Sequence, residues 1–437
     1  VNAESSATFQ LPPAAWGVPQ QGLEGSGISR RAYRVRTSAP VAAWQLNPMA
    51  GSPMASADGS MLLPSAALGE AHRSLAQRQY DDAVNGAWRA GLTVVATRPG
   101  LTNVTIFANI SMLGGPDVPA LQSGAEQIFK LQQGDVLNLQ SDQSNGDLSG
   151  MWVGSGQPVA VFGSNEAALA PATGNCVPNS KGNKICAGVF TSPISCTTDE
   201  GCPSPCCGDH LEGQLLPQPL WGKVYVAAHL ARRGKEGETW RVVSGQDQTI
   251  VNLDPLIGKL VPQMDSGQSF EFHTDKDFVL TANVPVQLAR ITSGGQATVT
   301  TTSAPCSTDA DCKNKHGFEG VCGVADAPDF CQPLGDPALL VEVPTERYRP
   351  KHAIAVPAGY IQTWLQITAP PGATVAIDAV VLGTSEFASV ASSSWRVARV
   401  AVKAGYHSVA ADQPVGVQVY GWGRSVAFAW PGGISSP

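Results

Sequence analysis

The chain has 437 residues, which predicts roughly two to four domains of ordinary size. Only 14% of the residues are charged, while Gly occupies 46 positions and Pro 33, so long exposed helices are not expected. The net charge of −7, without a long Lys/Arg block, argues against nucleic acid as a partner, and no run reaches the roughly 18 apolar residues of a membrane span.

Four segments of the chain begin with Pro-Val and continue with alternating apolar residues. They start at Pro40, Pro158, Pro285 and Pro414. This alternation is typical of a half-buried strand, and a proline at its start removes no N–H that the ladder needs. We therefore predict one such strand in each of four related units.

Two further elements recur between the Pro-Val strands. The first is a predicted β-hairpin, two alternating strands around a turn, and the second is a strand that follows a Gly turn. The hairpins cover residues 93–106, 240–251 and 365–377, and the Gly-turn strands cover residues 134–139, 267–272 and 405–409. Since three hairpins accompany four Pro-Val strands, we expect that Val1 is not the natural start, unless a neighbouring chain donates the missing segment.

The repeat predicts an all-β protein of tandem antiparallel β-sandwich-like units with two disulfide-rich loop insertions. A propeller-like ring is the alternative, since radial repetition also gives a regular period. One short helical insertion is expected near residues 68–84, where Ala71, Leu75 and Ala76 form an apolar stripe. The expected organisation is a partial first unit (1–46), a second unit (47–165), a Cys-rich insertion (166–214), a third unit (215–302), a second Cys-rich insertion (303–331) and a fourth unit (332–437).

All ten cysteines fall in the two insertions. The first holds Cys176, Cys186, Cys196, Cys202, Cys206 and Cys207, and the second holds Cys306, Cys312, Cys322 and Cys331. Such Gly- and Pro-rich segments cannot bury a core, so we predict three disulfides in the first and two in the second, with the pairing open. Zinc bound by Cys202, Cys206, Cys207 and His210 is the alternative, although adjacent cysteines fit the usual ligand spacing poorly. Disulfides place the protein outside the cytosol.

No catalytic motif is apparent in the sequence. Asp265-Ser266-Gly267 matches one half of an aspartic-protease pair, but a second copy is missing. The polar loop 141–147 has oxygen ligands for calcium but lacks the EF-hand spacing, so a solvated turn is favoured. We therefore expect no enzyme and no cofactor, with calcium left as a possibility.

Four stretches of the chain resemble the N-terminal domain family of the IgGFc-binding protein, found in animal mucus proteins and in exported proteins of myxobacteria. They are residues 31–48 with 58–64, 147–163, 209–217 with 221–223, and 414–423 with 430–433. The resemblance implies an extracellular, β-rich binding or adhesion module without known chemistry. The other features favour an exported bacterial member of the myxobacterial type, so binding of immunoglobulin Fc is not carried over.

Within those stretches, Asp209, His210 and Glu212 form the most specific polar cluster, and Trp221 follows it. They are candidates for binding a ligand or cation. The alternative is that the polar residues cap and hydrogen-bond a strand start and that the tryptophan packs in the core.

The favoured function is recognition or adhesion at a cell surface or outside the cell, with a surface glycan or a protein as ligand. A structural subunit of an extracellular filament or envelope layer is the alternative. Its units would self-associate by strand addition to the incomplete first unit.

Overall fold

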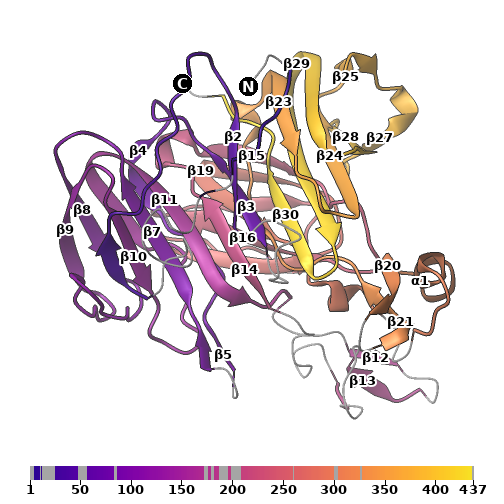
Figure 1. Cartoon of the computed structure of the whole chain (residues 1–437), viewed down its shortest axis with the longest axis horizontal. Helices are drawn as coiled ribbons and strands as arrows, with labels where there is room; N and C mark the ends of the chain where they lie inside the picture. The colour runs from indigo at the N-terminus through magenta and orange to yellow at the C-terminus, as the bar shows by residue number, and fades with distance from the viewer. Residues whose placement is uncertain are drawn as a thin grey trace.

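The computed structural model describes residues 4–9, 11, 25–47, 57–82, 86–171, 176–178, 182–186, 195–197, 208–258, 260–299, 304–324 and 327–435. Over these residues the chain is nearly all β, in antiparallel sheets, with one α-helix, α1 (Asp309–His316) (Figure 1). The predicted all-β class is confirmed, and the described sheets form no closed propeller.

Three long strands organise the molecule: β11 (Trp152–Ala168), β19 (Phe278–Ile291) and β29 (Gly405–Gly423). Each contains one of the predicted Pro-Val pairs near its middle. Most neighbours pair with residues on one side of the proline only, so that each long strand takes part in two groups of strands. One neighbour in each unit pairs on both sides of the proline, with a register shift between them. Because proline has no N–H, the ladder is interrupted there and the strand can turn from one sheet into the other.

Each long strand is the centre of a two-layered unit. In the first unit, the first half of β11 lies with β4 (Gly69–Arg73), β8 (Leu101–Phe107) and β9 (Glu126–Gln132), and the second half with β1 (Gly27–Ser29), β7 (Ala90–Ala96), β10 (Val136–Gln140) and β14 (Asp209–Gln214).

In the second unit, the first half of β19 lies with β15 (Gly222–Ala227) and β17 (Val251–Asp254), and the second half with β16 (Glu238–Ser244), β18 (Ser269–Thr274) and β22 (Leu339–Val341). In the third, the first half of β29 lies with β23 (Arg349–Val356), β25 (Val375–Ile377) and β26 (Val380–Val381), and the second half with β24 (Gln362–Ala369), β27 (Phe387–Ser389), β28 (Arg396–Ala401) and β30 (Val426–Pro431).

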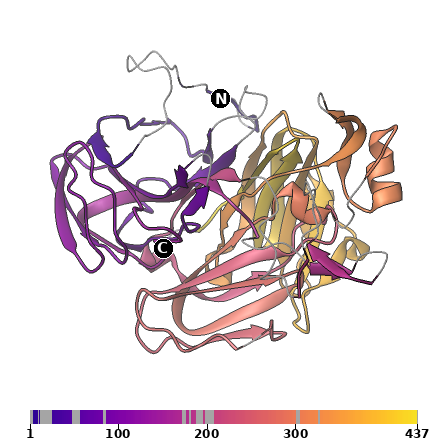
Figure 2. The same cartoon turned by 90° about the horizontal axis from the view of Figure 1, so that it is seen from below.

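The remaining elements connect or decorate these units. They are β2 (Ala43–Asn47), β3 (Asp58–Leu62), β5 (Tyr80–Asp82), β6 (Gly86–Trp88), β12 (Cys176–Pro178), β13 (Lys184–Cys186), β20 (Gly320–Val324) and β21 (Ala327–Pro333), with single 3₁₀ turns at Gln218–Leu220, Gly295–Thr298, Thr345–Arg347 and Thr384–Glu386. Figure 2 shows the first unit on the left, the third on the right and the second running beneath both.

The three predicted hairpins are not hairpins. Their strand pairs are β7 and β8, β16 and β17, and β24 and β25, and in each case the two strands pair with opposite halves of the long strand and not with each other. The turn between them therefore crosses from one layer to the other. Apolar alternation places a strand in a sheet but does not identify its neighbour, which is why the hairpin prediction is wrong.

Two further expectations fail locally. Residues 405–409 are the first half of β29, and the strand that takes the place of β10 and β18 in the third unit is β28. The helix expected near residues 68–84 is also absent from their described part, which holds β4 and β5. Pairing of β4 with β11 and the complete burial of Leu75 and Ala76 override the helical pattern.

Buried arginines join the units to each other. Arg241 of β16 reaches into the first unit, where its Nη1 bonds the Asp147 carboxylate at 3.2 Å and the Ser149 hydroxyl at 2.9 Å, while Nη2 donates to Gln77 Oε1 at 2.9 Å. Glu271 of β18 pairs with the same guanidinium from its own unit. The side chain of Arg241 is only 1% exposed, whereas the carboxylates of Asp147 and Glu271 are 28% and 24% exposed, so water reaches the acidic side of these ion pairs alone.

Arg290 of β19 joins the second unit to the third. Its Nε donates to Glu342 at 2.6 Å, Nη1 to Glu238 at 3.1 Å and Nη2 to Gln418 of β29 at 3.1 Å. The guanidinium also stacks 4.3 Å from the ring centre of Trp240. Two carboxylates and an amide thus surround a cation that has no exposed surface.

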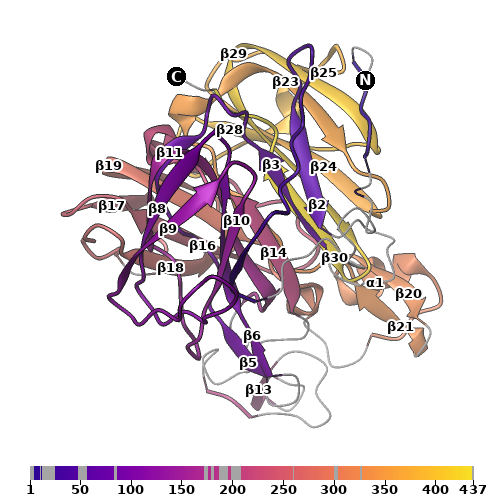
Figure 3. The same ribbon diagram turned by 60° about the vertical axis from the view of Figure 1, so that its left-hand side comes forward.

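The two Cys-rich insertions leave their units at the same topological point, between a long strand and its returning neighbour. The described bridges are Cys176–Cys196, Cys306–Cys322 and Cys312–Cys331, and Cys186 is also disulfide-bonded. Cys202, Cys206 and Cys207 lie outside the described residues. Both insertions project from the lower end of the molecule in Figures 1 and 3.

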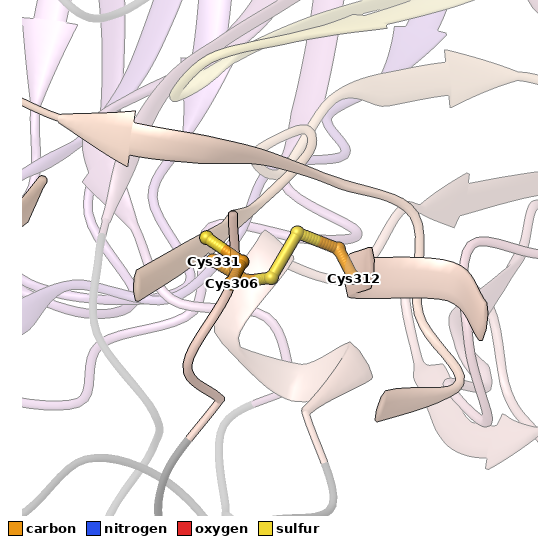
Figure 4. Close-up of side chains that lie close together, drawn as sticks. All are labelled: Cys306, Cys312 and Cys331. Carbon is orange, nitrogen blue, oxygen red and sulfur yellow. A yellow bond between two sulfur atoms is a disulfide. The ribbon is translucent and has the colours of Figure 1, made fainter. Parts of the chain in front are cut away.

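Figure 4 shows Cys306, Cys312 and Cys331 close together in the second insertion. Their sulfur atoms lie within 4.8 Å of one another, a spacing that could suit a metal ion. Each sulfur is already part of a disulfide, however, and a disulfide sulfur is not the thiolate that metals bind. This cluster is therefore a pair of packed disulfides that replaces an apolar core for the insertion.

Arg290→Met should destabilise the protein by about 3 to 5 kcal/mol, because it leaves Glu238 and Glu342 buried without a counter-charge. Urea unfolding followed by tryptophan fluorescence measures the change. The triple variant Arg290→Met, Glu238→Gln, Glu342→Gln removes the stranded charges and should recover part of the loss. A single variant within about 1 kcal/mol of the wild type would contradict the role of Arg290.

Ala379→Gly should stabilise the protein by about 0.5 to 1 kcal/mol, because a positive φ costs an alanine more than a glycine. The β25–β26 turn consists of Asp378 and Ala379, and both have positive φ, 50° and 65°. Thermal unfolding should show a higher Tm for this variant. The control Ala388→Gly, at an exposed position of strand β27, should lower Tm instead.

Candidate functional site

The polar cluster predicted from the sequence lies on β14, where the first unit meets the N-terminal hairpin of β2 and β3. Glu212 is 8% exposed, and its carboxylate accepts hydrogen bonds from Gln45 Nε2 at 2.8 Å and Asn47 Nδ2 at 3.5 Å, both on β2. His210 Nε2 lies 3.6 Å from the same carboxylate. Asp209 is buried at the start of the strand and accepts the His210 N–H at 2.8 Å.

A buried carboxylate that sequence reasoning did not single out, Asp58 of β3, completes this junction. One of its oxygens accepts the backbone N–H groups of Glu212 at 3.1 Å and Leu339 at 2.9 Å, and the other accepts that of Gly59 at 2.8 Å. Burial raises the pKa of Asp58 well above its ordinary value, and the three N–H donors oppose that rise. Asp58 therefore connects β3, β14 and β22 at one point.

An acidic residue followed by glycine occurs in both strands of the junction, but the same pair occurs at four other places in the chain and so does not single out Asp58. In the junction it appears as Asp58-Gly59 and as Glu212-Gly213. A Cβ on Gly59 would lie 2.6 Å from the ring of Trp430, so the glycine lets β3 approach β30 closely. The hairpin of β2 and β3 also contacts β30 through Trp44, whose ring centre lies 6.3 Å from that of Trp430.

Trp221, the fourth predicted candidate, is only 4% exposed. Its indole Nε1 donates to the Leu216 carbonyl at 2.9 Å, and its ring packs in the core of the first unit. The structure thus brings Asp209, His210 and Glu212 together and places Trp221 in the core beyond them. Of the four side chains, Glu212 links β14 to β2 by hydrogen bonds, and Trp221 fills the core.

Two cavities in the described part of the chain are small. The one at the junction is lined by β3, β14, β22 and β30 and has a volume of about 10 Å³, which is close to the space of one water molecule. A second cavity of about 10 Å³ lies between the second and third units. A small organic substrate does not fit in either cavity.

The polar loop at residues 141–147 uses its carboxylates in ion pairs. Asp142 lies 3.0 Å from Arg89 Nη1, and Asp147 lies 3.2 Å from Arg241 Nη1. The Asp147 carboxylate also accepts the Ser149 N–H at 2.9 Å, so the loop anchors the second unit to the first.

An exposed apolar surface lies on the outer face of β8 and β9, and we call it the β8–β9 face. Phe107 is 45% exposed and Ile128 53%, and the register places Ile128 opposite Thr105, two residues from Phe107. Trp152 of β11 pairs directly with Phe107, and the Arg73 guanidinium lies 4.9 Å from the Trp152 ring centre. Exposed aromatic and aliphatic groups next to an arginine are typical of a contact surface for a macromolecule.

A family model described as IgGFc binding protein matches residues 58–421 of the chain. The match begins at Asp58 and covers all of the second unit and most of the first and third, with β1 and β30 outside it. Among curated proteins, none matches the chain. In the described part of the chain, no helix has the length and apolar character that a membrane-crossing helix requires.

Asp58→Asn should destabilise the protein by about 2 to 3 kcal/mol, because an amide nitrogen cannot accept the backbone N–H bonds that a carboxylate oxygen receives. Hydrogen exchange should become faster at the amides of Glu212 and Leu339. The control Asp275→Asn, at an exposed residue, should change stability by less than about 0.5 kcal/mol. Unchanged exchange at both amides would contradict the role of Asp58.

His72→Leu should reduce the loss of stability in acid. His72 of β4 has no exposed surface and no hydrogen-bond partner at either ring nitrogen, and burial lowers its pKa from 6.5 to about 3. In the unfolded chain this histidine binds a proton below about pH 6.5, whereas in the folded chain it stays neutral down to about pH 3. The free energy of unfolding therefore falls as the pH drops from 6.5 toward 3.

The variant should remove about 1.4 kcal/mol per pH unit from the slope of unfolding free energy between about pH 6 and pH 4. Urea unfolding at several pH values measures that slope. Thr102→Val, at another buried side chain without a hydrogen-bond partner, should leave the slope unchanged. An equal slope in the wild type and in His72→Leu would contradict the assignment.

Proposed function

Because the chain belongs to the IgGFc-binding protein family, we propose that it is a non-catalytic recognition and adhesion protein that works outside the cell. The family is one of binding proteins, and the disulfides of the two insertions agree with an oxidising, extracellular setting. Its ligand would be a protein or a glycan on another surface. Immunoglobulin Fc is named by the family and is not part of the proposal, and a bacterial origin stays a prediction.

The observation that carries this proposal is the charged packing between the units. Arg241 ties the second unit to the first through an ion pair with Asp147, and Arg290 ties it to the third through a hydrogen bond to Gln418. Units joined in this way keep their surfaces in a fixed relation. A preorganised surface loses little conformational freedom on binding, which favours recognition of a large partner.

The β8–β9 face is the part of this surface best suited to a protein ligand. Phe107, Ile128 and Trp152 supply apolar contact area, while Glu126 and Lys130 on the same side of β9 supply charge at its edge. A central apolar group with polar residues around it is the usual composition of a protein–protein interface.

The alternative function, a structural subunit assembled by strand addition, has one observation in its favour. Strand β9 is at the edge of its sheet over seven residues, and an edge strand offers backbone groups to another chain. Glu126 and Lys130 work against such pairing, because charged residues on edge strands discourage association. Native mass spectrometry across a concentration series separates the two functions: adhesion predicts monomers and the structural role predicts ordered polymers.

A binding screen tests the proposed function directly. The full, non-reduced chain is applied to arrays of extracellular proteins and of glycans, and the wild type should bind a defined subset. Phe107→Ser with Ile128→Ser should weaken binding to a protein ligand at least about tenfold. Ile361→Ser with Val380→Ser removes equally exposed apolar groups elsewhere and should leave binding unchanged. Specific turnover of an array compound would overturn the non-catalytic assignment.

A further inference from the structure

A basic segment lies between β1 and β2, in a chain that is acidic elsewhere. Residues 30–36 contain Arg30, Arg31, Arg34 and Arg36, and no Asp or Glu occurs between residues 25 and 57. The remaining 24 basic residues of the chain are outnumbered by 35 acidic ones. This segment is therefore a local concentration of positive charge that the net charge of −7 conceals.

The structure places this basic segment on the outside of the molecule. It leaves the first sheet where Ser29 of β1 pairs with Val136 of β10, and continues without helix or strand to a bend at residues 38–39. Figures 1 and 3 show it as an indigo tube running along the surface toward β2. Val35 is 71% exposed, and every residue from 33 to 40 is exposed.

Three of the arginines are available to an external anion. Arg30 is 70% exposed, and its contact with Asp135 is long, at 3.4 Å. Such an exposed pair contributes about 1 kcal/mol or less, so an incoming anion can replace it. Arg34 and Arg36 make no ion pair with the described residues. The three arginines thus lie within seven residues of an exposed segment.

The geometry of the segment favours a linear ligand with repeated charges. From Arg30 to Arg36 an extended chain covers roughly 20 Å. Neither of the two cavities described above is lined by these arginines. Guanidinium groups form paired hydrogen bonds with planar or tetrahedral anionic groups, and such contacts depend on charge and spacing only.

We propose that residues 30–36 bind a sulfated polysaccharide through Arg30, Arg34 and Arg36. This inference deepens the proposed extracellular function and rests on it, because the extracellular setting supplies sulfated chains and makes nucleic acid a less suitable polyanion. Each arginine replaces a counterion at a sulfate or carboxylate group of the polysaccharide. The affinity therefore falls as the salt concentration rises. The surface is separate from the apolar β8–β9 face and takes a ligand of different chemistry.

Binding of a fluorescently labelled heparin hexasaccharide to the full chain tests the proposal by anisotropy, at a series of salt concentrations. The wild type should bind it, and Arg30→Ser, Arg34→Ser, Arg36→Ser together should lower the affinity at least about tenfold and flatten the salt dependence. The matched control Lys235→Ser, Lys276→Ser, Lys403→Ser changes net charge equally at exposed sites of the other units and should retain binding. All three arginines are exposed, so both triple variants should keep the wild-type Tm.

Three outcomes would overturn the proposal. Equal weakening by both triple variants would mean that only net charge matters. Equal affinity for a single-stranded DNA of the same length would mean that the site is not one for sulfated sugars. Failure to bind the hexasaccharide, while the array screen still finds a protein or neutral glycan ligand, would remove the basic segment as a site and leave the proposed function standing.

Discussion

The arrangement of the three units depends on Arg290, a guanidinium without exposed surface at the contact between the second and third units. A buried cation is stable only when its charge and its N–H groups all have partners, and Glu238, Glu342 and Gln418 meet that requirement only if both units are in place. Sliding one unit against the other would break the hydrogen bond between Arg290 and Gln418 and leave a buried N–H of the guanidinium without a partner. Arg241 crosses from the second unit to the first, where its guanidinium pairs with Asp147 and donates to Ser149 and Gln77.

Within each unit, the proline of the long strand determines the topology. Because proline has no N–H, the long strand can take part in two layers. Most of the neighbouring strands then pair with one half of the long strand or with the other. The strand that returns beside each long strand, β14, β22 or β30, meets its counterparts at the junction held by Asp58. The returning strands of the three units thus meet at one polar junction. The loops between the long and the returning strands lie on the surface, where they can carry disulfide-rich insertions.

The sequence predicted strands much better than it predicted their partners. The Pro-Val repeat at Pro158, Pro285 and Pro414 located all three long strands, because proline and alternation are local signals. The hairpins failed, because pairing is a property of two segments and alternation records only burial. The polar cluster on β14 was found from its residue types, but its partner Asp58 is 151 residues away from Asp209 in the chain, and no local pattern reports a contact at that separation.

Scanning calorimetry of the non-reduced protein at neutral pH tests the central claim, that buried charge makes the three units one rigid body. Units locked by Arg241 and Arg290 should unfold together, so the calorimetric enthalpy should equal the van't Hoff enthalpy in a single transition. Units that are merely tethered should unfold separately, with a calorimetric enthalpy about three times the van't Hoff value or with resolved transitions. The second result would contradict a rigid body whose surfaces are held in place by buried charge.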